Sequence, residues 1–386
     1  MPRTLIHATT KLGFLGAGQL ARMSALQAFR FGIQVAVFSD RPEDEPVQFM
    51  TPFSYSGSFD SVDDMVAFAK TCDVVTLENE FISSDLLKQV QEQSGTPIFP
   101  SPASFALIEN KLIEKETFEA AGIPVTPYKL VKSEEDLITF GDEYGWPFML
   151  KSSKGGYDGY GNAIAKDLET AKEGFDKLGG IKGHDILAEA FVPFTKELAV
   201  QVARNETGTV VYPCCETVQE NHINVAVVSP APIDEKHQKR AQKLAIKAME
   251  AIDGKGIFAF EFFLTDSGEI LLNESAPRPH NSGHYTIEGC VTSQFENHVR
   301  SVLGLPLGST QMNKPVAVMM NLLGTHNRPA KTDHISESLA TENGHLHVYG
   351  KIQSKVGRKM AHYTLLGENG EDTFNKAKAL TKGIEI

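Results

Sequence analysis

The chain has 386 residues, with 37 basic and 49 acidic side chains and a formal charge of −12. A hydrophobic content of 41% is typical of a globular protein, and the length predicts two or three domains. The acidic excess argues against a dedicated nucleic-acid binder and against binding to anionic membranes. It does not exclude small anionic ligands, because local charge can oppose the net charge.

No run of about 18 apolar residues indicates a membrane-spanning helix. Residues 1–10 lack the apolar stretch and the cleavage site of a signal peptide. The cysteines at positions 72, 214, 215 and 290 fit neither a zinc site nor a disulfide framework. We therefore expect reduced thiols and a cytoplasmic protein.

The first third of the chain alternates short apolar runs with amphipathic stretches, which is typical of a parallel sheet covered by helices. We expect strands and helices in turn at 12–15, 19–31, 33–38, 62–70, 73–77 and 85–93. After three prolines, a helix is expected over 104–121, and Gly122 and Pro124 close it.

The remainder begins with a small α+β unit, expected over 123–191, that contains a glycine-rich loop at 152–162. Its elements are predicted at 128–131, from 133 onward, and at 147–151, 163–165, 168–178 and 186–190. Beyond it, strands are expected at 197–203, 209–215, 257–264 and 269–273, with a long helix at 234–252. We interpret the basic side chains of this helix as a solvated face: Lys236, Lys239, Arg240 and Lys243.

The first motif is a glycine loop, Gly16-x-Gly18-x-x-Ala21, between a strand and a helix. Asp40 follows 22 residues after Gly18, so the spacing satisfies the dinucleotide fingerprint. Such a loop lets backbone N–H groups approach a phosphate at a helix N-terminus. A tight turn without a ligand is the alternative.

Two pairs of carboxylates follow predicted strands. Glu78 and Glu80 lie just past a buried strand, where open α/β sheets place ligands, and they suit a ribose hydroxyl or an amine. Glu189 and Glu197 lie where two domains would join, a common position for a nucleotide cleft. Acids at a helix start and surface glutamates are the respective alternatives.

The glycine-rich loop follows two lysines, Lys151 and Lys154, and reads Gly155–Asn162. Its backbone amides could close over a polyphosphate while a lysine offsets charge. The Walker A pattern is absent, and a flexible hairpin is the alternative.

A hairpin carries the clearest geometric prediction. If Ser267–Gly268 is a two-residue loop, Asp266 opposes Glu269 and Glu261 opposes Glu274. Directly opposed carboxylates among apolar residues repel unless a cation lies between them, and Mg²⁺ fits. A salt bridge to a lysine is the alternative, and a three-residue loop would break the register.

Two further segments are rich in hydrogen-bonding groups. Arg278, His280 and Asn281 lie in a proline- and glycine-rich stretch, which we interpret as an anion-recognition loop. Lys351 and Arg358 belong to a basic cluster near the C-terminus, which suits a phosphate or a solvated surface equally.

Together these motifs resemble the ATP-grasp superfamily and, within it, the N5-carboxyaminoimidazole ribonucleotide synthetases, which are ATPase subunits of phosphoribosylaminoimidazole carboxylase. The string Asn273–His284 is the most specific part, and residues 16–20, 76–80, 155–162, 189–197, 293–296 and 357–360 support it. The resemblance implies an α/β ATP-grasp fold with a Rossmann-like domain at 1–122, a lid at 123–194 and a C-terminal domain at 195–386. It also implies a homodimer.

The implied reaction carboxylates 5-aminoimidazole ribonucleotide with bicarbonate, using ATP and Mg²⁺ and passing through carboxyphosphate. ATP contacts would come from Lys111, Lys151, Gly156, Tyr157, Asp158, Gly159, Tyr160, Gly161, Asn162, Glu189, Ala190, Phe191, Val192, Glu197, His222, Asn273 and Glu274. Glu261 and Glu274 would hold Mg²⁺. The expected catalytic groups are Arg278, His280, Asn281, Glu78, Glu80 and Tyr157. Those around the substrate nucleotide are Gly18, Gln19, Leu20, Glu78, Lys351 and Arg358.

The chain departs from the family pattern at a few positions. Lys111 replaces a usual arginine, Tyr160 a common lysine, and Ala361 a usual glycine. Ala276 stands where many ATP-grasp enzymes place a third metal ligand, so two protein ligands are expected.

Other functions remain open from the sequence. Glycinamide ribonucleotide transformylases and biotin carboxylases share the implied fold and the acyl-phosphate chemistry. An NAD-dependent oxidoreductase would use the Gly16–Asp40 fingerprint, but it leaves the opposed carboxylates unexplained. A nucleotide sensor without turnover is a third possibility.

Overall fold

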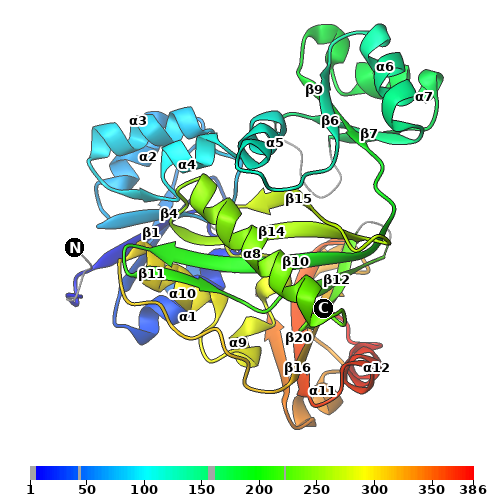
Figure 1. The fold of residues 1–386 in the computed structure, drawn as a ribbon. Coiled ribbons are helices and arrows are strands. Elements are labelled where there is room, and N and C mark those ends of the chain that lie inside the picture. The colour runs from blue at the N-terminus through cyan, green and yellow to red at the C-terminus, as the bar shows by residue number, and fades with distance from the viewer. Residues whose placement is uncertain (1–5, 42–44, 155–160, 221–222) are drawn as a thin grey trace.

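The computed structural model describes residues 6–41, 45–154, 161–220 and 223–386. Figure 1 shows an N-terminal layered unit beside a large C-terminal sheet, with a small unit standing apart at one end. Gly156, Tyr157, Asp158, Gly159, Tyr160 and His222, all predicted ATP contacts, lie outside the described residues.

The N-terminal unit is a parallel sheet with strand order β3-β2-β1-β4-β5. Its strands are β1 (Lys11–Leu15), β2 (Gln34–Ser39), β3 (Phe53–Ser56), β4 (Val74–Leu77) and β5 (Ile98–Phe99). Helices α1 (Gln19–Arg30), α2 (Val62–Ala69) and α3 (Ser84–Ser94) accompany it, and a 3-10 turn covers Gln48–Met50. The predicted parallel sheet is confirmed, and the sequence analysis missed only its short outer strands, β3 and β5.

The single helix predicted over 104–121 is wrong. The segment forms two helices, α4 (Pro102–Ala106) and α5 (Lys111–Ala120). Each has its own N-cap, because the Ser101 hydroxyl accepts from the Ser104 amide and Asn110 Oδ1 accepts from the Leu112 and Ile113 amides. The break directs α5 toward the C-terminal sheet.

The small unit has an antiparallel sheet with order β6-β9-β7-β8. Its elements are β6 (Tyr128–Val131), α6 (Glu134–Tyr144), β7 (Phe148–Ser152), β8 (Asn162–Ala165), α7 (Leu168–Lys177), a 3-10 turn (Gly180–Lys182) and β9 (Ile186–Ala190). Ser133 and Asp167 begin the two helices with reciprocal capping boxes. This unit has its own apolar core, so it is a separately packed body.

The C-terminal part is built on one antiparallel sheet whose main path is β15-β14-β10-β12-β13-β16-β20-β18, with β11 beside β10. Its strands are β10 (Phe194–Asn205), β11 (Gly208–Val211), β12 (Cys215–Glu220), β13 (Ile223–Ser229), β14 (Gly256–Thr265), β15 (Ile270–Ala276), β16 (Val316–Leu323), β18 (Gly344–Val348) and β20 (Lys359–Gly367). Its helices are α8 (Glu235–Ala251), α9 (Thr286–Gly289), α10 (Gln294–Val302), α11 (Ser336–Ala340) and α12 (Gly370–Thr381), and β17 (Arg328–Pro329) pairs with β19 (Gln353–Ser354). The single strand predicted at 209–215 is wrong: it divides into β11 and β12 around Pro213, which has no N–H to donate.

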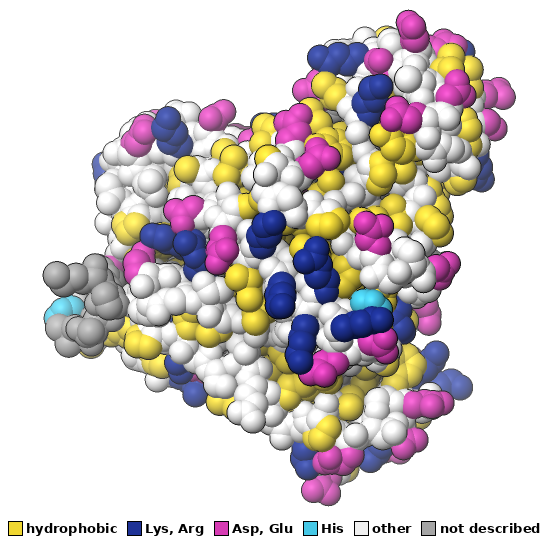
Figure 2. Space-filling model, viewed as in Figure 1, with side chains coloured by type: hydrophobic (Ala, Val, Ile, Leu, Met, Phe, Trp, Pro, Cys, Tyr) yellow, Lys and Arg dark blue, Asp and Glu magenta, His cyan; other side chains and the backbone are white. Residues whose placement is uncertain are grey.

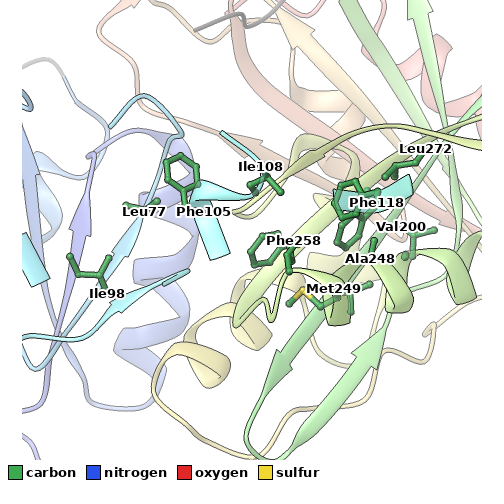
Figure 3. Packing of buried hydrophobic residues seen from close by; sticks show 14 of the residues in the cluster. Leu77, Ile98, Phe105, Ile108, Phe118, Val200, Ala248, Met249, Phe258 and Leu272 are labelled. Carbon is green, nitrogen blue, oxygen red and sulfur yellow. The ribbon is translucent and has the colours of Figure 1, made fainter. Parts of the chain in front are cut away.

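A continuous apolar core joins the N-terminal unit to the large sheet. Figure 3 shows Leu77 and Phe105 on one side and Phe258 and Met249 on the other, within one cluster. Because α5 contributes Phe118 to the same cluster, the segment that leads into the small unit is fixed by packing.

The described surface carries a basic group over α8, visible at the centre of Figure 2. Lys236, Lys239, Arg240 and Lys243 are all exposed, which agrees with a solvated helix face. Among the described residues, no helix combines the length and the apolar content needed to cross a membrane.

Candidate active site

Glu261 and Glu274 lie opposite each other on β14 and β15, as predicted. The predicted turn is nevertheless wrong. The loop has three residues, Asp266–Gly268, because Leu264 pairs with Ile270 and the Thr265 amide donates to the carbonyl of Glu269 at 3.0 Å. Asp266 therefore does not oppose Glu269, and the register shifts by one residue.

A β-bulge restores the carboxylate pair. Phe262 pairs with Leu272 while Glu261 pairs with Glu274, so Asn273 is the extra residue. The bulge also frees the carbonyl of Asn273, which accepts a hydrogen bond from Lys115 Nζ at 3.2 Å. The bulge thus aligns Glu261 with Glu274 and connects β15 to α5 through Lys115.

The two carboxylates differ in their charge. Burial, with the neighbouring Glu274 and Glu197, raises the pKa of Glu261. Lys111, whose Nζ lies 3.0 Å from Glu274 Oε2, holds the pKa of Glu274 well below its usual range. Glu261 also lies beside the carboxylate of Glu274, so repulsion between the two groups contributes to its raised pKa, and a bridging cation would relieve this repulsion.

A buried lysine network lies beside this pair. Glu189, at the end of β9, accepts from Lys151 Nζ at 2.7 Å and faces Lys115 Nζ at 3.4 Å. Burial alone would raise the pKa of Glu189, but Lys115 and Lys151 lower it to about 2. Lys115 also donates to Thr126 Oγ1 at 2.7 Å. The carboxylate of Glu189 therefore positions two lysines.

Glu114 is a further buried acid, and it is only 4% exposed. Its Oε1 accepts from the Ser275 amide at 2.8 Å and from the Ser275 hydroxyl. Burial raises its pKa to about 7, although Lys111 opposes the shift. Glu114, Lys115 and Thr126 could not be predicted from the sequence, since partners such as Ser275, Asn273 and Glu189 lie far away along the chain.

The anion-recognition loop runs from the end of β15. Arg278 forms a two-pronged ion pair with Glu80, with Nη2 at 2.7 Å from Oε1 and Nε close to Oε2. Burial alone would raise the pKa of Glu80, but Arg278 lowers it. Burial and then Arg278 lower the pKa of His280 to about 3, so its imidazole is neutral.

The side-chain amide of Asn281 is engaged by two neighbouring asparagines. Its Oδ1 accepts from Asn321 Nδ2 at 2.7 Å and from Asn224 Nδ2 at 3.2 Å, and its Nδ2 donates to Asn321 Oδ1 at 2.9 Å. This amide network joins the loop to β13 and β16. The geometry favours a positioning role for Asn281.

The glycine loop surrounds the Glu78 carboxylate. The Leu20 amide donates to Glu78 Oε1 at 3.2 Å, and a Cβ added to Gly18 would lie 2.4 Å from the same oxygen. Burial raises the pKa of Glu78, while the amides of Gly18 and Leu20 oppose the shift. The N-terminus of α1 thus holds a carboxylate of the chain itself.

Two C-terminal cations face this loop. Burial, followed by Arg358, lowers the pKa of Lys351 to about 8, and Glu78 and Glu45 also act on it. The Nζ of Lys351 donates to the carbonyl of Lys359 at 2.8 Å, and Arg358 Nη1 donates to the carbonyl of Gln353 at 3.1 Å. Lys351 therefore lies within electrostatic reach of Glu78, a predicted substrate residue on the N-terminal unit, and Arg358 lies within reach of Glu45 and Lys351.

One cleft brings together eight of the predicted site residues, beside Glu114. The described residues that line it include Glu80, Lys111, Glu114, Lys151, Asn162, Glu261, Glu274, Arg278 and His280. Two side-chain oxygens, Asn162 Oδ1 and Asn273 Oδ1, are buried without a hydrogen-bond partner among the described residues. The cleft thus combines acidic, cationic and free acceptor groups, a set suited to a metal-bound polyphosphate.

Comparison with known families agrees with this geometry. Residues 116–295 match the model of the ATP-grasp domain, so the fold and the cleft define an ATP-grasp enzyme. Residues 9–109 match the ribonucleotide synthetase preATP-grasp domain, and residues 317–376 match the phosphoribosylaminoimidazole carboxylase C-terminal domain.

Individual relatives show to which family of ATP-grasp enzymes the chain belongs. The N5-carboxyaminoimidazole ribonucleotide synthase of Bacillus subtilis is 35% identical over 95% of this chain and 94% of its own. The phosphoribosylaminoimidazole carboxylase of Ogataea methanolica is 39% identical over 94% of this chain, and the match spans 67% of that protein. The chain thus spans about two thirds of the length of such carboxylases. Accordingly, the chain belongs to the N5-carboxyaminoimidazole ribonucleotide synthase family.

Solved structures support the same conclusion. The synthetase of Thermotoga maritima has a TM-score of 0.85 and 39% identity, covering 97% of this chain and 99% of its own. The synthase of Aspergillus clavatus in complex with ADP and 5-aminoimidazole ribonucleotide has a TM-score of 0.86 and 34% identity, covering 97% and 99%. As a member of this family, the chain is an ATP-binding ligase of purine biosynthesis.

Proposed function

We propose that this chain carboxylates 5-aminoimidazole ribonucleotide with bicarbonate and releases ADP, phosphate and N5-carboxyaminoimidazole ribonucleotide. The observation that carries the proposal is one cleft in which the Glu261–Glu274 pair, two lysines and the Arg278 loop converge. These groups serve a metal, a polyphosphate and a small oxyanion respectively.

ATP would lie between the small unit and the large sheet. Lys111 and Lys151 would offset charge on its phosphates, and both are already held by carboxylates at 3.0 and 2.7 Å. The segment Ala190–Val192 follows β9 at the root of the small unit, where backbone groups suit the base. Phe191 there is 55% exposed, so its ring is accessible to an aromatic ligand.

The acidic pair fits Mg²⁺. Two carboxyl groups that oppose each other across β14 and β15 provide hard oxygen ligands whose mutual repulsion a divalent cation would relieve. No larger group of metal-ligating side chains occurs among the described residues, so phosphate oxygens would complete the coordination. Bound there, the ion would stabilise negative charge on the transferred phosphoryl group.

The proposed reaction has two steps. A bicarbonate oxygen forms a bond to the γ-phosphorus as the bond to the β-bridging oxygen breaks, giving ADP and carboxyphosphate. The exocyclic amine of the nucleotide then attacks the carboxyl carbon, phosphate leaves with the bonding electron pair, and the amine loses a proton. Arg278 and His280 would hold the intermediate, and exclusion of water would preserve it.

The substrate nucleotide would bind between the N-terminal unit and the C-terminal part. Gly18, Gln19 and Leu20 would approach its phosphate, with Lys351 and Arg358 opposite. Glu78, which now accepts from the Leu20 amide, would release this amide and turn toward the ribose or the amine.

Further parts of the proposal concern the whole protein. We expect the domain division 1–122, 123–194 and 195–386, a cytoplasmic location and a homodimer. The family resemblance supports the homodimer, and sedimentation equilibrium of the full chain would measure it.

The decisive experiment is ADP release by the full chain with each substrate omitted in turn. We expect turnover only when 5-aminoimidazole ribonucleotide, bicarbonate and Mg-ATP are all present. Equal turnover with glycinamide ribonucleotide or biotin in place of the aminoimidazole would overturn the proposal. Mg-ATP binding without turnover would favour a nucleotide sensor.

A further inference from the structure

His280 begins a short helical turn. It is the N-cap of the 3-10 turn Asn281–Gly283, and its side chain accepts a hydrogen bond from the backbone N–H of Ser282. The contact joins Ser282 N to His280 Nδ1 at 3.4 Å. A backbone N–H can only donate, so Nδ1 must present a lone pair.

A second donor reaches the same nitrogen. Ser282 Oγ lies 2.8 Å from His280 Nδ1 and itself accepts from Gln201 Nε2 at 2.8 Å. Because the Ser282 backbone N–H requires a lone pair on Nδ1, the nearby hydroxyl must donate its hydrogen to the same nitrogen, while Gln201 donates to the hydroxyl oxygen. Ser282 and Gln201 are both 0% exposed, so water does not compete for these groups.

The backbone of His280 is fixed as well. Gln294 Oε1 accepts from the His280 amide at 3.0 Å, and Gln294 Nε2 donates to its carbonyl at 2.7 Å. A ring flip that brought Nδ1 toward the cleft would break both contacts with Ser282, one of which is the cap. The ring orientation is therefore determined by its surroundings.

We propose that Ser282 and Gln201 are positioning residues that fix His280 as the Nε2–H tautomer, so that His280 donates a hydrogen bond to the bound carboxyl or phosphate oxygen. This inference rests on the proposed function for the identity of the anion. It also assigns a negative role: with its hydrogen on Nε2, that nitrogen cannot take the proton that the substrate amine loses, and Nδ1 is already engaged by Ser282.

The neighbouring carboxyl group of Glu261 is compatible with this tautomer. Glu261 Oε1 lies 3.7 Å from Nδ1, beyond hydrogen-bond distance, whereas Ser282 Oγ is at 2.8 Å. No hydrogen bond to Nε2 is recorded among the described residues, and His280 lines the cleft. The N–H of Nε2 is thus the group that His280 offers to a ligand.

The first test reads the tautomer directly, without any turnover. The full chain is labelled with ¹⁵N-histidine, and two-bond ¹H–¹⁵N correlations are recorded at neutral pH, with His280 assigned from the His280→Gln spectrum. We expect a protonated Nε2 and an unprotonated Nδ1. A protonated Nδ1 in the wild-type chain would overturn the proposal, whatever the enzyme's substrates prove to be.

The second test separates donor from base. Gln at position 280 keeps an N–H donor but cannot accept a proton, whereas Leu of similar size does neither. We expect the KM for bicarbonate to rise roughly 10- to 100-fold more in His280→Leu than in His280→Gln. Equal loss in both variants, with unchanged melting temperatures, would refute the donor role.

The third test addresses the positioning residues. In Ser282→Ala one of the two donors to Nδ1 is lost, so we expect the second tautomer to become detectable and the KM for bicarbonate to rise about fivefold. Gln201→Met frees the hydroxyl to turn away and should act in the same direction. An unchanged tautomer and KM in both variants would show that the cap alone is sufficient and would remove their assigned role.

Discussion

Replacing Lys115 by Met tests the buried lysine network, because Lys115 has contacts in three parts of the chain. Its Nζ lies 3.4 Å from Glu189 Oε1, and it donates to Thr126 Oγ1 at 2.7 Å and to the Asn273 carbonyl at 3.2 Å. Removing one partner of a buried ion pair costs about 3–5 kcal/mol. Lys151 remains at 2.7 Å from Glu189, so we expect the lower end, about 3 kcal/mol.

The measurement is the free energy of unfolding in urea, followed by circular dichroism. Lys239→Met is the matched control, because its ion pair with Glu235 is exposed (63% and 76%) and should contribute within about 0.5 kcal/mol. The double variant Lys115→Met/Glu189→Gln removes both charges and should be more stable than additivity predicts. A loss below about 1 kcal/mol in Lys115→Met would refute the network.

Three other predictions concern the acids and the glycine loop. The folded pKa of Glu114, about 7, lies above its ordinary value of 4.5, so its stabilising contribution is complete below pH 4.5 and is lost as the pH rises through 7. Glu114→Gln should therefore gain stability over the wild type between pH 4.5 and 7, by up to about 3 kcal/mol in urea unfolding. Glu274→Gln should reduce bicarbonate-dependent ADP release at least about 100-fold. Gly18→Ala places a Cβ against Glu78 and should raise the KM for 5-aminoimidazole ribonucleotide about tenfold.

Each of these has a result that contradicts it. A stability difference that does not vary with pH would show that Glu114 is ionised in the folded chain. Near-normal turnover of Glu274→Gln would contradict the assignment of Glu274 as a metal ligand. Gly370→Ala is the control for the loop, since no atom lies within 4 Å of its added Cβ. An equal effect on KM in this control would show that contact with Glu78 does not explain the effect of Gly18→Ala.

The Glu261–Glu274 pair shows which features of the site could be predicted from the sequence and which could not. Opposition of Glu261 and Glu274 was predicted from a two-residue loop, yet the loop has three residues and a bulge at Asn273 compensates. The predicted pair is correct although the predicted turn is wrong, because the pattern of apolar residues in these strands does not indicate the bulge.

Other errors had local signals. Pro213 lies inside the predicted strand 209–215, and Asn110 inside the predicted helix 104–121, where each acts as a break. Lys115 offered no such signal. Its position on α5 looks like an ordinary helix lysine, and only the fold brings Glu189 and Asn273 to it.

The attachment of Glu189 at the base of the small unit limits how that unit can move. A body fixed near one corner turns about that corner, so the displacement of each strand grows with its distance from β9. In the sheet order β6-β9-β7-β8, strand β8 is the outer strand on the side of Lys151 and Asn162. A small rotation about this point would therefore move β8 further than the segment that follows β9. Of the two lysines on Glu189, Lys151 belongs to β7 of the same unit, whereas Lys115 on α5 ties the carboxylate to the neighbouring part of the chain.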